Sequence, residues 1–392
     1  MMEGSMRVAL YHPWVYLKSG LERSLLEIHR RSRHQVTIYT SHFDRDGTYP
    51  ELARAGVVEL PRVSVRRSYG PVIAAAAQIA RTRMDPDAFD ALVISCDGLG
   101  DLLTLRNHDK PVMALCFTPL RAVYDEAYRA RLLDRVGPLG RPLALGMEAG
   151  YRAIDRACWR HYSAAVAISD TIRQRIDAGG LWPADKVQVL YPGIDGTRIA
   201  PGSGSDPYFL ISGRIMWTKN IRLGLEAFAL AKQALPGWRL VVAGMVDEKS
   251  RAHADELMAR GREIGGVEFR IGNTDAQMRD LYDRCTALLF TPFNEDWGLT
   301  PLEAMAAAKP VIAVDRGGPR ESVADGVTGF LAPDDPAAFA ARMVQLAQDP
   351  ALARRLGEAG LERARLFTWD AFVGGLDDAI ETMVEQGREH RA

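Results

Sequence analysis

Apolar, β-prone runs alternate with helical segments along nearly the whole chain. In the first half such runs, each followed by a polar or helical segment, occupy residues 7–14, 36–40, 91–95, 111–116 and 164–169. The second half restarts the alternation with runs at 208–213, 239–244, 267–272, 287–292 and 310–314. Between these runs the spacing of apolar residues predicts helices over 21–32, 221–234, 250–264, 274–285 and from 299 onward. Strands this apolar are expected to be buried on both faces, so the pattern predicts an α/β protein with parallel sheets.

The length and one linker-like stretch predict two domains. A chain of 392 residues exceeds what one hydrophobic core usually organises. Residues 196–206 are rich in Gly, Ser and Pro and separate the two series of strands, which predicts a linker there. We therefore expect a first doubly wound domain over 1–195 and a second over 207–368. Open parallel sheets bind ligands at the carboxyl ends of their strands, so the site is expected in a cleft between the two domains.

Composition excludes several classes of function. The 49 basic and 50 acidic residues give a formal net charge of −1, so no overall positive field attracts nucleic acid. The four cysteines are widely spaced and form no C-x-x-C pair, which predicts neither a zinc site nor a disulfide framework. The first residues do not resemble a signal peptide and no run is long enough to cross a bilayer. These features predict a cytoplasmic protein.

The stretch from Asn294 to Leu331 is the most informative for chemistry. Glu295 lies just before a predicted helix and Glu303 lies inside it. Proline is well suited to a first helical turn, as at Pro301, and glycine allows close approach of a ligand, as at Gly298. The free N–H groups of Gly298, Leu299 and Thr300 are therefore predicted to bind a phosphate. The alternative is that the acidic residues only complement a helix dipole on a solvated surface, which we expect for Asp296.

A second stretch places two cations after the first strand of the second domain. Arg214 follows Gly213 at the end of that strand, and Lys219 lies five residues further along. A diphosphate is well held by one planar, forked cation and one point charge, which an arginine and a lysine supply. The commoner fate of such residues is solvation on a loop. Their position at the end of a strand favours binding of a diphosphate.

Taken together, these motifs resemble the retaining, nucleotide-sugar-dependent glycosyltransferases of family 4, which have the GT-B fold of two Rossmann-like domains facing across a cleft. The resemblance covers nearly the whole chain. It rests on the E-x7-E element, the Arg214 and Lys219 pair, YPGID at 191–195 and FTWDAF at 367–372. The stretches NEDWGLTPLEAMA and CFTPLRAVYD are most similar to the bacterial branch that includes many mannosyltransferases.

The resemblance implies a role for each candidate in the second domain. Arg214 and Lys219 would hold the donor diphosphate, and Glu295 would contact the transferred sugar. Glu303 would accept hydrogen bonds from the two ribose hydroxyls. The nucleobase would lie near Arg270, Ile271 and Asn273. A nucleoside-diphosphate sugar is therefore the expected co-substrate.

The resemblance also implies features outside that domain. The loop with Ser19 and Gly20 corresponds to a glycine-rich loop near the diphosphate and acceptor, while for Glu22 we favour stabilisation of the following helix. The last helix, about 369–392, would pack back on the first domain. The family fold needs no metal, and no cofactor is expected. The D-x-D spellings at 44–46 and 85–87 are accordingly interpreted as solvated loops.

One residue departs from the family pattern. Related mannosyltransferase-like sequences carry a histidine before Thr-Pro that is thought to hydrogen-bond the 6-hydroxyl of the sugar, whereas this chain carries Phe117. A phenyl ring cannot make that bond, so one hypothesis is a donor without a 6-hydroxyl, either a 6-deoxyhexose or a pentose. The alternative is a hexose such as mannose, with Phe117 in the core and another residue replacing the histidine. His12 could be that substitute or an acceptor contact, the alternative being a loop histidine whose hydrogen bonds are satisfied within the protein. Asp97 is a weaker acceptor-side candidate.

The segment between Tyr124 and Tyr162 is dense in arginine, with acidic residues interspersed. We expect an ordinary solvated helical face there, the alternative being a surface for an acceptor or for anionic lipid. The acceptor is not specified by the sequence and is a glycan, a lipid-linked molecule or a small molecule. Membrane contact is expected to be at most peripheral, at the inner face of the membrane.

The sequence therefore predicts a retaining glycosyltransferase. One alternative is another GT-B nucleotide-sugar enzyme, such as an epimerase or a phosphorylase, against which the E-x7-E element argues. The other is a catalytically retired GT-B module that acts as a partner of another transferase, for which Phe117 is the only motive.

Overall fold

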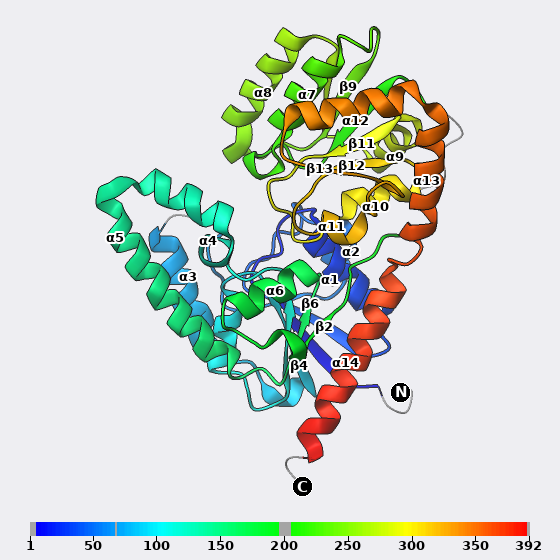
Figure 1. Ribbon diagram of the computed structural model, residues 1–392. Coiled ribbons are helices and arrows are strands. Elements are labelled where there is room, and N and C mark those ends of the chain that lie inside the picture. Colours follow the sequence, from blue (N-terminus) through cyan, green and yellow to red (C-terminus); the bar gives the residue numbers. More distant parts are fainter. Residues whose placement is uncertain (1–4, 67–68, 196–204, 390–392) are drawn as a thin grey trace. The chain divides into compact units, whose positions relative to one another are not determined.

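The computed structural model describes residues 5–66, 69–195 and 205–389. The chain divides into two compact units, which are described separately (Figure 1). The first unit comprises Met1–Pro192 and Trp369–Ala392, and the second comprises Gly193–Thr368. The first unit ends three residues before the expected boundary at 195, because Ile194 forms a parallel bridge with Thr368. Most of the expected linker, 196–204, lies outside the described residues.

The first unit contains a seven-stranded parallel sheet in the order β3-β2-β1-β4-β5-β6-β7. Its strands are β1 (Arg7–Tyr11), β2 (Gln35–Thr40), β3 (Val58–Glu59), β4 (Ala91–Cys96), β5 (Val112–Cys116), β6 (Ala164–Ala167) and β7 (Val187–Val189). Every residue of β4 and β5 is buried, as the apolar runs predict.

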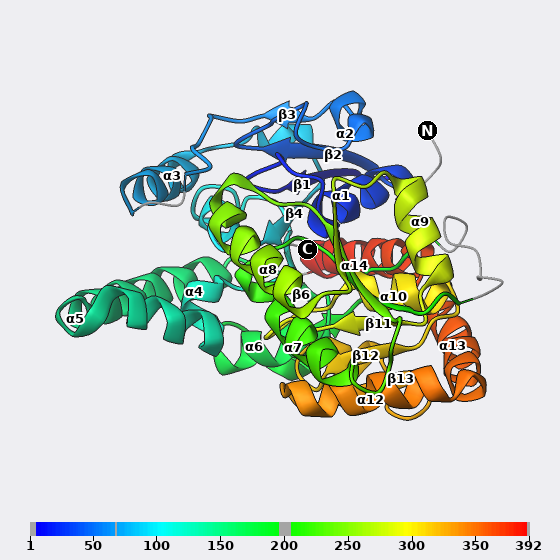
Figure 2. The ribbon, with the colours of Figure 1, turned by 90° about the horizontal axis from the view of Figure 1, so that it is seen from above.

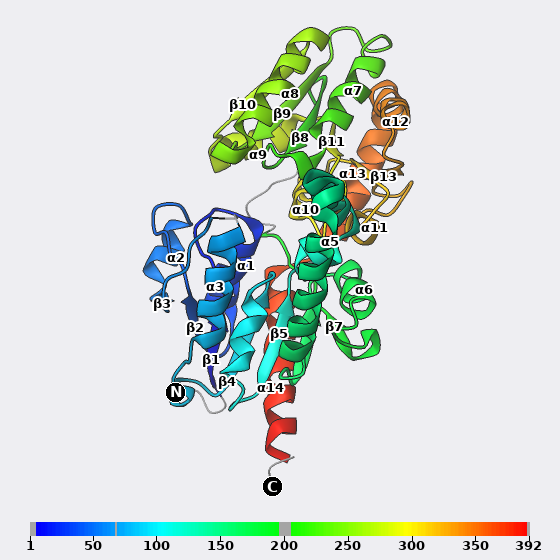
Figure 3. The same cartoon turned by 90° about the vertical axis from the view of Figure 1, so that its left-hand side faces the viewer.

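The helices of the first unit cover both faces of this sheet. They are α1 (Gly20–Arg31), α2 (Pro50–Arg54), α3 (Tyr69–Arg81), α4 (Arg121–Tyr124), α5 (Glu126–Trp159), α6 (Asp170–Ala178) and α14 (Trp369–Glu389). Figure 3 shows α3 and α5 in front of the sheet and α14 behind it. Both faces are therefore shielded from water, which is what wholly buried strands require.

The second unit contains a six-stranded parallel sheet in the order β10-β9-β8-β11-β12-β13. Its strands are β8 (Tyr208–Ser212), β9 (Arg239–Gly244), β10 (Val267–Ile271), β11 (Ala287–Phe290), β12 (Val311–Val314) and β13 (Gly329–Ala332). The core between sheet and helices is built from fully buried side chains such as Phe209, Phe228 and Phe339.

Helices also cover both faces of the second sheet. They are α7 (Ile221–Ala231), α8 (Arg251–Ile264), α9 (Asp275–Arg284), α10 (Leu299–Ala306), α11 (Pro319–Ser322), α12 (Pro336–Gln348) and α13 (Pro350–Ala364). Figure 2 shows α7, α8 and α12 on one side of the strands and α9, α10 and α13 on the other. The predicted fold class, two doubly wound α/β units with parallel sheets, is confirmed.

Each sheet has a point at which the direction of winding reverses. In the first unit the chain moves outward from β1 to β3 and then returns to β4, which pairs with β1 on its other side. In the second unit it moves outward from β8 to β10 and returns to β11, which pairs with β8. At such a point the loops that follow the two neighbouring strands run in opposite directions. A crevice therefore forms at the carboxyl ends of these strands, and open α/β sheets bind ligands there. Ligand sites are therefore expected at the loops after β1 and β4 in the first unit and after β8 and β11 in the second.

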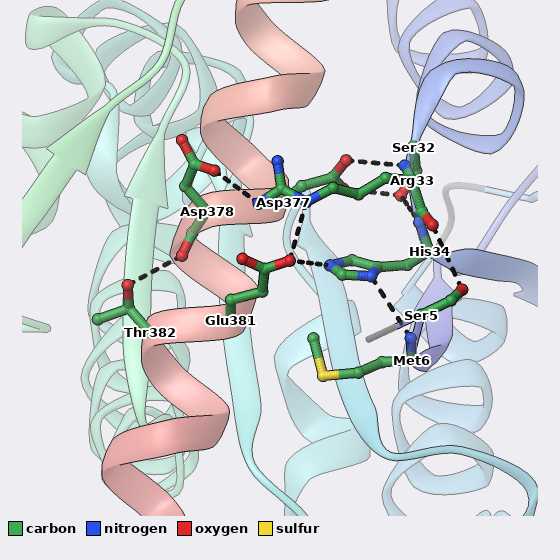
Figure 4. Close-up of polar contacts among 9 residues, drawn as sticks. All are labelled: Ser5, Met6, Ser32, Arg33, His34, Asp377, Asp378, Glu381 and Thr382. Atoms are coloured by element: carbon green, nitrogen blue, oxygen red, sulfur yellow. Dashed lines mark hydrogen bonds and ion pairs between the residues drawn. The ribbon is translucent and has the colours of Figure 1, made fainter. Parts of the chain in front are cut away.

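The last helix belongs to the first unit although the whole second unit, Gly193–Thr368, separates it in sequence from the other elements there. Buried Asp377 on α14 accepts hydrogen bonds from Ser32 Oγ at 2.7 Å and from the Arg33 N–H at 3.0 Å (Figure 4). The Arg33 guanidinium also donates to Asp378 at 2.6 Å and to Glu381 at 2.8 Å. These contacts attach α14 to the end of α1.

Candidate functional site

The loop after β8 carries the two predicted cations. Gly213 has φ +140°, and Arg214 beside it is exposed and makes no hydrogen bond or ion pair with the described residues. Lys219 ends a short 3-10 turn, and Asn220 follows with φ +45° before α7 begins. This left-handed residue turns the chain sharply into the helix, which fixes the position of the lysine backbone.

The loop after β11 is bonded to the loop after β8. Lys219 Nζ donates to Glu295 Oε2 at 2.6 Å, and both side chains are partly shielded from water. Thr291 Oγ1 donates to the Lys219 carbonyl oxygen at 2.7 Å, and the Phe293 N–H donates to the Thr218 carbonyl oxygen at 3.1 Å. The structure thus brings Lys219 and Glu295, predicted separately from two motifs, into direct contact at the reversal point of the sheet.

Three glycines shape the backbone around Glu295. Gly298 has φ +90°, and a Cβ there would lie 2.9 Å from Phe290 Cζ. Gly317 has φ +66° and leaves no room for a Cβ beside the Glu295 carbonyl oxygen, while the Gly318 N–H donates to that oxygen at 2.8 Å. Gly298 was predicted from the sequence, whereas Gly317 and Gly318 were not, although the spelling R-G-G-P marks a tight turn.

Asp296 differs from its expectation. Its predicted place was a solvated surface, but only 6% of the residue is exposed. That prediction is wrong, because the turn that places Glu295 beside Lys219 directs the next residue into the protein. Burying a carboxylate costs free energy unless the group is paired, so we infer that Asp296 helps to hold the conformation of this loop.

Helix α10 begins directly after Gly298, and its first turn contains no acidic side chain. The N–H groups of Leu299 and Thr300 are among the first of this helix and lack carbonyl partners within it. Because no carboxylate occupies the first turn, the partial positive charge there remains available to an anion. This geometry fits the phosphate-binding role predicted for Gly298, Leu299 and Thr300.

Glu303 lies one turn further along α10 and is held by a buried tyrosine. Tyr282 on α9 donates its hydroxyl to Glu303 Oε2 at 2.7 Å and lies 3.0 Å from Ser212 Oγ at the end of β8. Burial, reinforced by the nearby Glu303 carboxylate, raises the pKa of Tyr282 well above its usual value. The tyrosine is therefore a permanent hydrogen-bond donor that orients Glu303. Tyr282 was not predicted from the sequence, since a tyrosine within a helix belongs to no motif.

The candidates for the nucleobase lie after β10, at the edge of the same sheet. Ile271 is 45% exposed, and Asn273 Nδ2 donates to the Arg270 carbonyl oxygen at 2.8 Å. The Arg270 guanidinium is bonded to Glu268 at 2.7 Å. The backbone here is fixed and the Ile271 side chain is open to solvent, while strand β9 separates this edge from β8.

In the first unit the candidates gather at the reversal point between β1 and β4. His12 is 3% exposed, and its Nδ1 lies 3.1 Å from Ser95 Oγ at the end of β4. Its Nε2 lies 4.0 Å from Asp97 Oδ2, whose side chain is 26% exposed. The two acceptor-side candidates are thus neighbours, with the histidine behind the carboxylate.

Phe117 follows β5, the strand next to β4. It is 7% exposed, and its N–H donates to the Cys96 carbonyl oxygen at 3.2 Å. An almost fully buried phenyl ring fits the alternative of a core aromatic. The exposed part of the Phe117 ring is a small apolar surface, and this is all that the side chain offers to a ligand at this end of the strand.

The loop after β1 ends in a helix cap. Ser19 Oγ accepts the Leu21 N–H at 3.2 Å, and its hydroxyl is also bonded to Glu22. The other oxygen of Glu22 accepts the Leu17 N–H at 3.1 Å, and only 3% of this residue is exposed. Glu22 therefore has the helix-stabilising role that we favoured. Gly20, the first residue of α1, is exposed.

The D-x-D spellings are ordinary turns. Asp44 accepts the N–H groups of Asp46 and Gly47, each at 3.1 Å, and Asp85 accepts the Asp87 N–H at 3.0 Å. Across residues 5–66, 69–195 and 205–389, no three His, Cys, Asp or Glu side chains are grouped as metal ligands would be. In the same described part, no helix is long and apolar enough to cross a bilayer.

Residues 198–363 match the family model described as glycosyl transferases group 1. Among curated proteins, the chain is 36% identical over 207 residues to alpha-1,3/1,6-mannosyltransferase ALG2 of Homo sapiens, covering 47% of this chain and 50% of that protein. It is 31% identical over 223 residues to D-inositol 3-phosphate glycosyltransferase of Streptomyces avermitilis, covering 52% and 48% respectively. The chain spans about half the length of these curated relatives.

Solved structures agree over nearly the full length. Sucrose-phosphate synthase from Thermosynechococcus elongatus has a TM-score of 0.75 at 17% identity, with 97% of this chain and 99% of that chain covered. Anabaena Alr3699/HepE, solved in complex with UDP and glucose, has a TM-score of 0.71 at 16% identity, with 96% and 99% covered. The fold is therefore the GT-B fold, and the match over residues 198–363 confirms the resemblance to group 1 glycosyltransferases for that part of the chain.

Proposed function

We propose that this protein is a retaining glycosyltransferase that moves a sugar from a nucleoside-diphosphate sugar to a hydroxyl group of an acceptor. The observation that carries the proposal is the contact between Lys219 and Glu295 at the carboxyl ends of β8 and β11. It places a cation, a carboxylate and the start of α10 around one point. The matched family and the named activities of the relatives support the same class of reaction.

The donor diphosphate would lie between Arg214, Lys219 and the first amides of α10. Arg214 is exposed and unpaired within the described residues, so binding an anion does not require it to leave a protein partner. Lys219 would exchange part of its contact with Glu295 for a phosphate oxygen. The released Glu295 oxygen would then accept hydrogen bonds from hydroxyl groups of the transferred sugar.

Glu303 would bind the ribose. Two neighbouring hydroxyls can donate together to one carboxylate, and Tyr282 already fixes one Glu303 oxygen at 2.7 Å. The nucleobase would lie against the exposed Ile271 and the backbone near Asn273. With these assignments the nucleotide would extend from its diphosphate at the centre of the sheet to its base at the β10 edge.

In the reaction, the bond between the anomeric carbon and the diphosphate oxygen breaks while the acceptor hydroxyl oxygen bonds to that carbon on the same face. The proton of the acceptor moves to an oxygen of the departing phosphate. Negative charge develops on the diphosphate, so Arg214, Lys219 and the amides of α10 supply the main stabilisation. No nucleophile from the protein and no metal is required in this scheme.

The donor sugar remains a choice between two hypotheses. The buried Phe117 would accommodate a sugar without a 6-hydroxyl, because an unpaired hydroxyl against an apolar wall is costly. A hexose such as mannose is favoured by the curated relatives named as mannosyltransferases. The acceptor is a glycan, a lipid-linked molecule or a small molecule.

The proposal is tested with the full chain and a panel of nucleoside diphosphates and their sugars. Ligands that bind only the folded state raise the melting temperature. We expect one nucleoside diphosphate and its sugars to raise the melting temperature, and we expect slow release of that nucleoside diphosphate from the nucleotide sugar. The Glu303→Ala variant should lose the shift in melting temperature. Glu226→Ala, which breaks an ion pair with Arg260 between α7 and α8, is the matched control and should keep the shift. No shift with any nucleotide would favour a retired module instead.

A further inference from the structure

Helix α5 of the first unit is interrupted about a third of the way along its length. Gly137 has φ +65° and ψ 178°, which are not helical, and Pro138 and Pro142 follow. The break separates residues 126–136 from 138–159, which form two helical arms. Figure 1 shows these arms reaching away from the strands of the first sheet, with the break at their far end.

The second arm exposes an apolar stripe to solvent. Leu139, Leu143, Met147 and Ile154 follow one another at intervals that place them on one face of a helix. Their exposed fractions are 99%, 72%, 42% and 49%. Amphipathic helices normally turn such a face toward the core, so its exposure here marks an interaction surface.

The part of α5 around the break is also basic. From residue 131 to 147, which we call the α5 tip, the chain contains three arginines and one acidic residue, Asp134. Arg135 and Arg141 are exposed and form no ion pair with any described residue. By contrast, Arg129 and Arg152, beyond this segment, are both paired with Glu148, at 2.7 and 3.0 Å. The arginines nearest the exposed leucines therefore keep a positive charge available.

We propose that the α5 tip docks on an anionic lipid bilayer, with Leu139 and Leu143 entering the interface and Arg135 and Arg141 contacting lipid phosphates. Exposed leucines beside unpaired cations are complementary to a surface that is negative outside and apolar beneath. A second copy of the chain is the alternative occupant of this surface, and the test below distinguishes it. This is the alternative to the ordinary solvated face that the sequence led us to expect.

The test uses the full chain and sedimentation with two kinds of vesicle, phosphatidylcholine alone and phosphatidylcholine with phosphatidylglycerol. We expect binding to the anionic vesicles that weakens as salt screens the charges. Arg135→Gln with Arg141→Gln should weaken binding about twenty-five-fold, from roughly fivefold for each arginine at a lipid surface. Leu139→Ser with Leu143→Ser should weaken it at least about tenfold, since each leucine loses apolar burial.

Matched controls are available in the second unit. The exposed fraction of Leu366, 69%, is similar to the 72% of Leu143. The Leu366→Ser variant should therefore bind vesicles as the unchanged protein does. Arg354 and Arg355 on α13 are exposed, and Arg354→Gln with Arg355→Gln should retain binding. Because all these side chains face solvent, circular dichroism should show that every variant folds.

Three results would overturn the proposal. One is no binding to anionic vesicles, and another is equal loss in tip and control variants. The third is concentration-dependent self-association that the tip variants abolish, which would identify a second copy as the occupant. Vesicle binding is measured without nucleotide or sugar, so its outcome is independent of the proposed transfer reaction.

Discussion

Lys219 Nζ lies 2.6 Å from Glu295 Oε2, although the two residues come from loops that are 76 positions apart in the chain. The contact joins the loops that leave β8 and β11, where the winding of the second sheet reverses. It gives each residue a defined position before any ligand arrives. In an active site such preorganisation is what allows charged groups to stabilise a transition state.

Substitutions of Lys219 and of Glu295 should have different effects on nucleotide binding and on turnover. Glu295→Gln keeps the shape of the side chain and an oxygen that accepts a hydrogen bond from Lys219, so we expect nearly normal binding of the nucleoside diphosphate with turnover lowered about a hundredfold or more. Lys219→Met removes a phosphate ligand and should weaken nucleotide binding as well. Calorimetry and a diphosphate-release assay separate the two effects. Equal loss of affinity in both variants would contradict the assigned roles.

Removing the hydroxyl of Tyr282 should affect both stability and nucleotide affinity. Tyr282→Phe deletes the donor to Glu303 and leaves that carboxylate free to rotate, at a cost of about 1 kcal/mol in unfolding free energy. The matched control is Tyr208→Phe, which deletes a buried hydroxyl that donates to the Leu281 carbonyl oxygen at 2.7 Å. Both variants should lose stability in urea, but only Tyr282→Phe should weaken nucleotide binding. A normal affinity in Tyr282→Phe would sink the idea that this tyrosine orients Glu303.

The start of α10 should not tolerate a side chain. Gly298→Ala meets both a positive φ and the Phe290 ring, so we expect a loss of more than about 1 kcal/mol together with loss of nucleotide binding. Gly326 has φ +71° but open space around it, so Gly326→Ala should show the backbone strain alone and keep binding. Melting temperatures and nucleotide titrations of the two variants make the comparison. Intact binding in Gly298→Ala would show that the helix start does not contact the ligand.

The first unit should lose stability as pH rises, because it buries a carboxyl group with an elevated pKa. Burial and the neighbouring Asp101 raise the pKa of Asp155 from 3.8 to about 8, against smaller opposing effects of Tyr124 and Arg152. The folded state then binds more protons than the unfolded state between these values, so the unfolding free energy falls with pH there. The slope contributed by one proton is at most about 1.4 kcal/mol per pH unit.

Urea denaturation between pH 5 and pH 8 checks this dependence. Asp155→Asn mimics the protonated form and should reduce the slope, while remaining at least as stable as the unchanged protein at pH 8. Asp155 Oδ1 has no hydrogen-bond partner and the residue is 3% exposed, which is the geometric reason for the shift. An unchanged slope in the variant would assign the dependence to other groups.

The attachment of α14 should depend on one aspartate more than on its neighbour. Asp377 is buried and accepts two hydrogen bonds from the end of α1, so Asp377→Ala should cost about 1–3 kcal/mol. Asp378 pairs with Arg33 from an exposed position, so Asp378→Ala should cost less than about 1 kcal/mol. Denaturant titration compares the two. Equal effects would show that exposure does not decide the contribution here.

Much of the fold was predictable because the strands are apolar and regularly spaced. The same regularity located the ends of β8 and β11, and therefore the loops that hold Arg214, Lys219 and Glu295. Strand β3 was not predicted, because it has two residues, both exposed. A strand this short carries no periodic signal.

What the sequence could not predict depends on tertiary contacts. The burial of Asp296 and the support of Glu295 by Gly317 and Gly318 arise where two loops meet, so neither loop reveals them alone. Tyr282 reaches Glu303 from another helix for the same reason. The apolar stripe of α5 has ordinary amphipathic spacing, and only the folded chain shows that its leucines face solvent.

The most direct test of the central claim is calorimetric titration of the full chain with a panel of nucleoside diphosphates, repeated on Arg214→Met with Lys219→Met. Arg354→Met with Arg355→Met on α13 is the control with the same loss of charge. We expect that one nucleoside diphosphate binds, that the site variant loses this binding and that the control keeps it. Binding that survives in the site variant, or that no nucleotide shows, would contradict a donor site at the reversal point between β8 and β11.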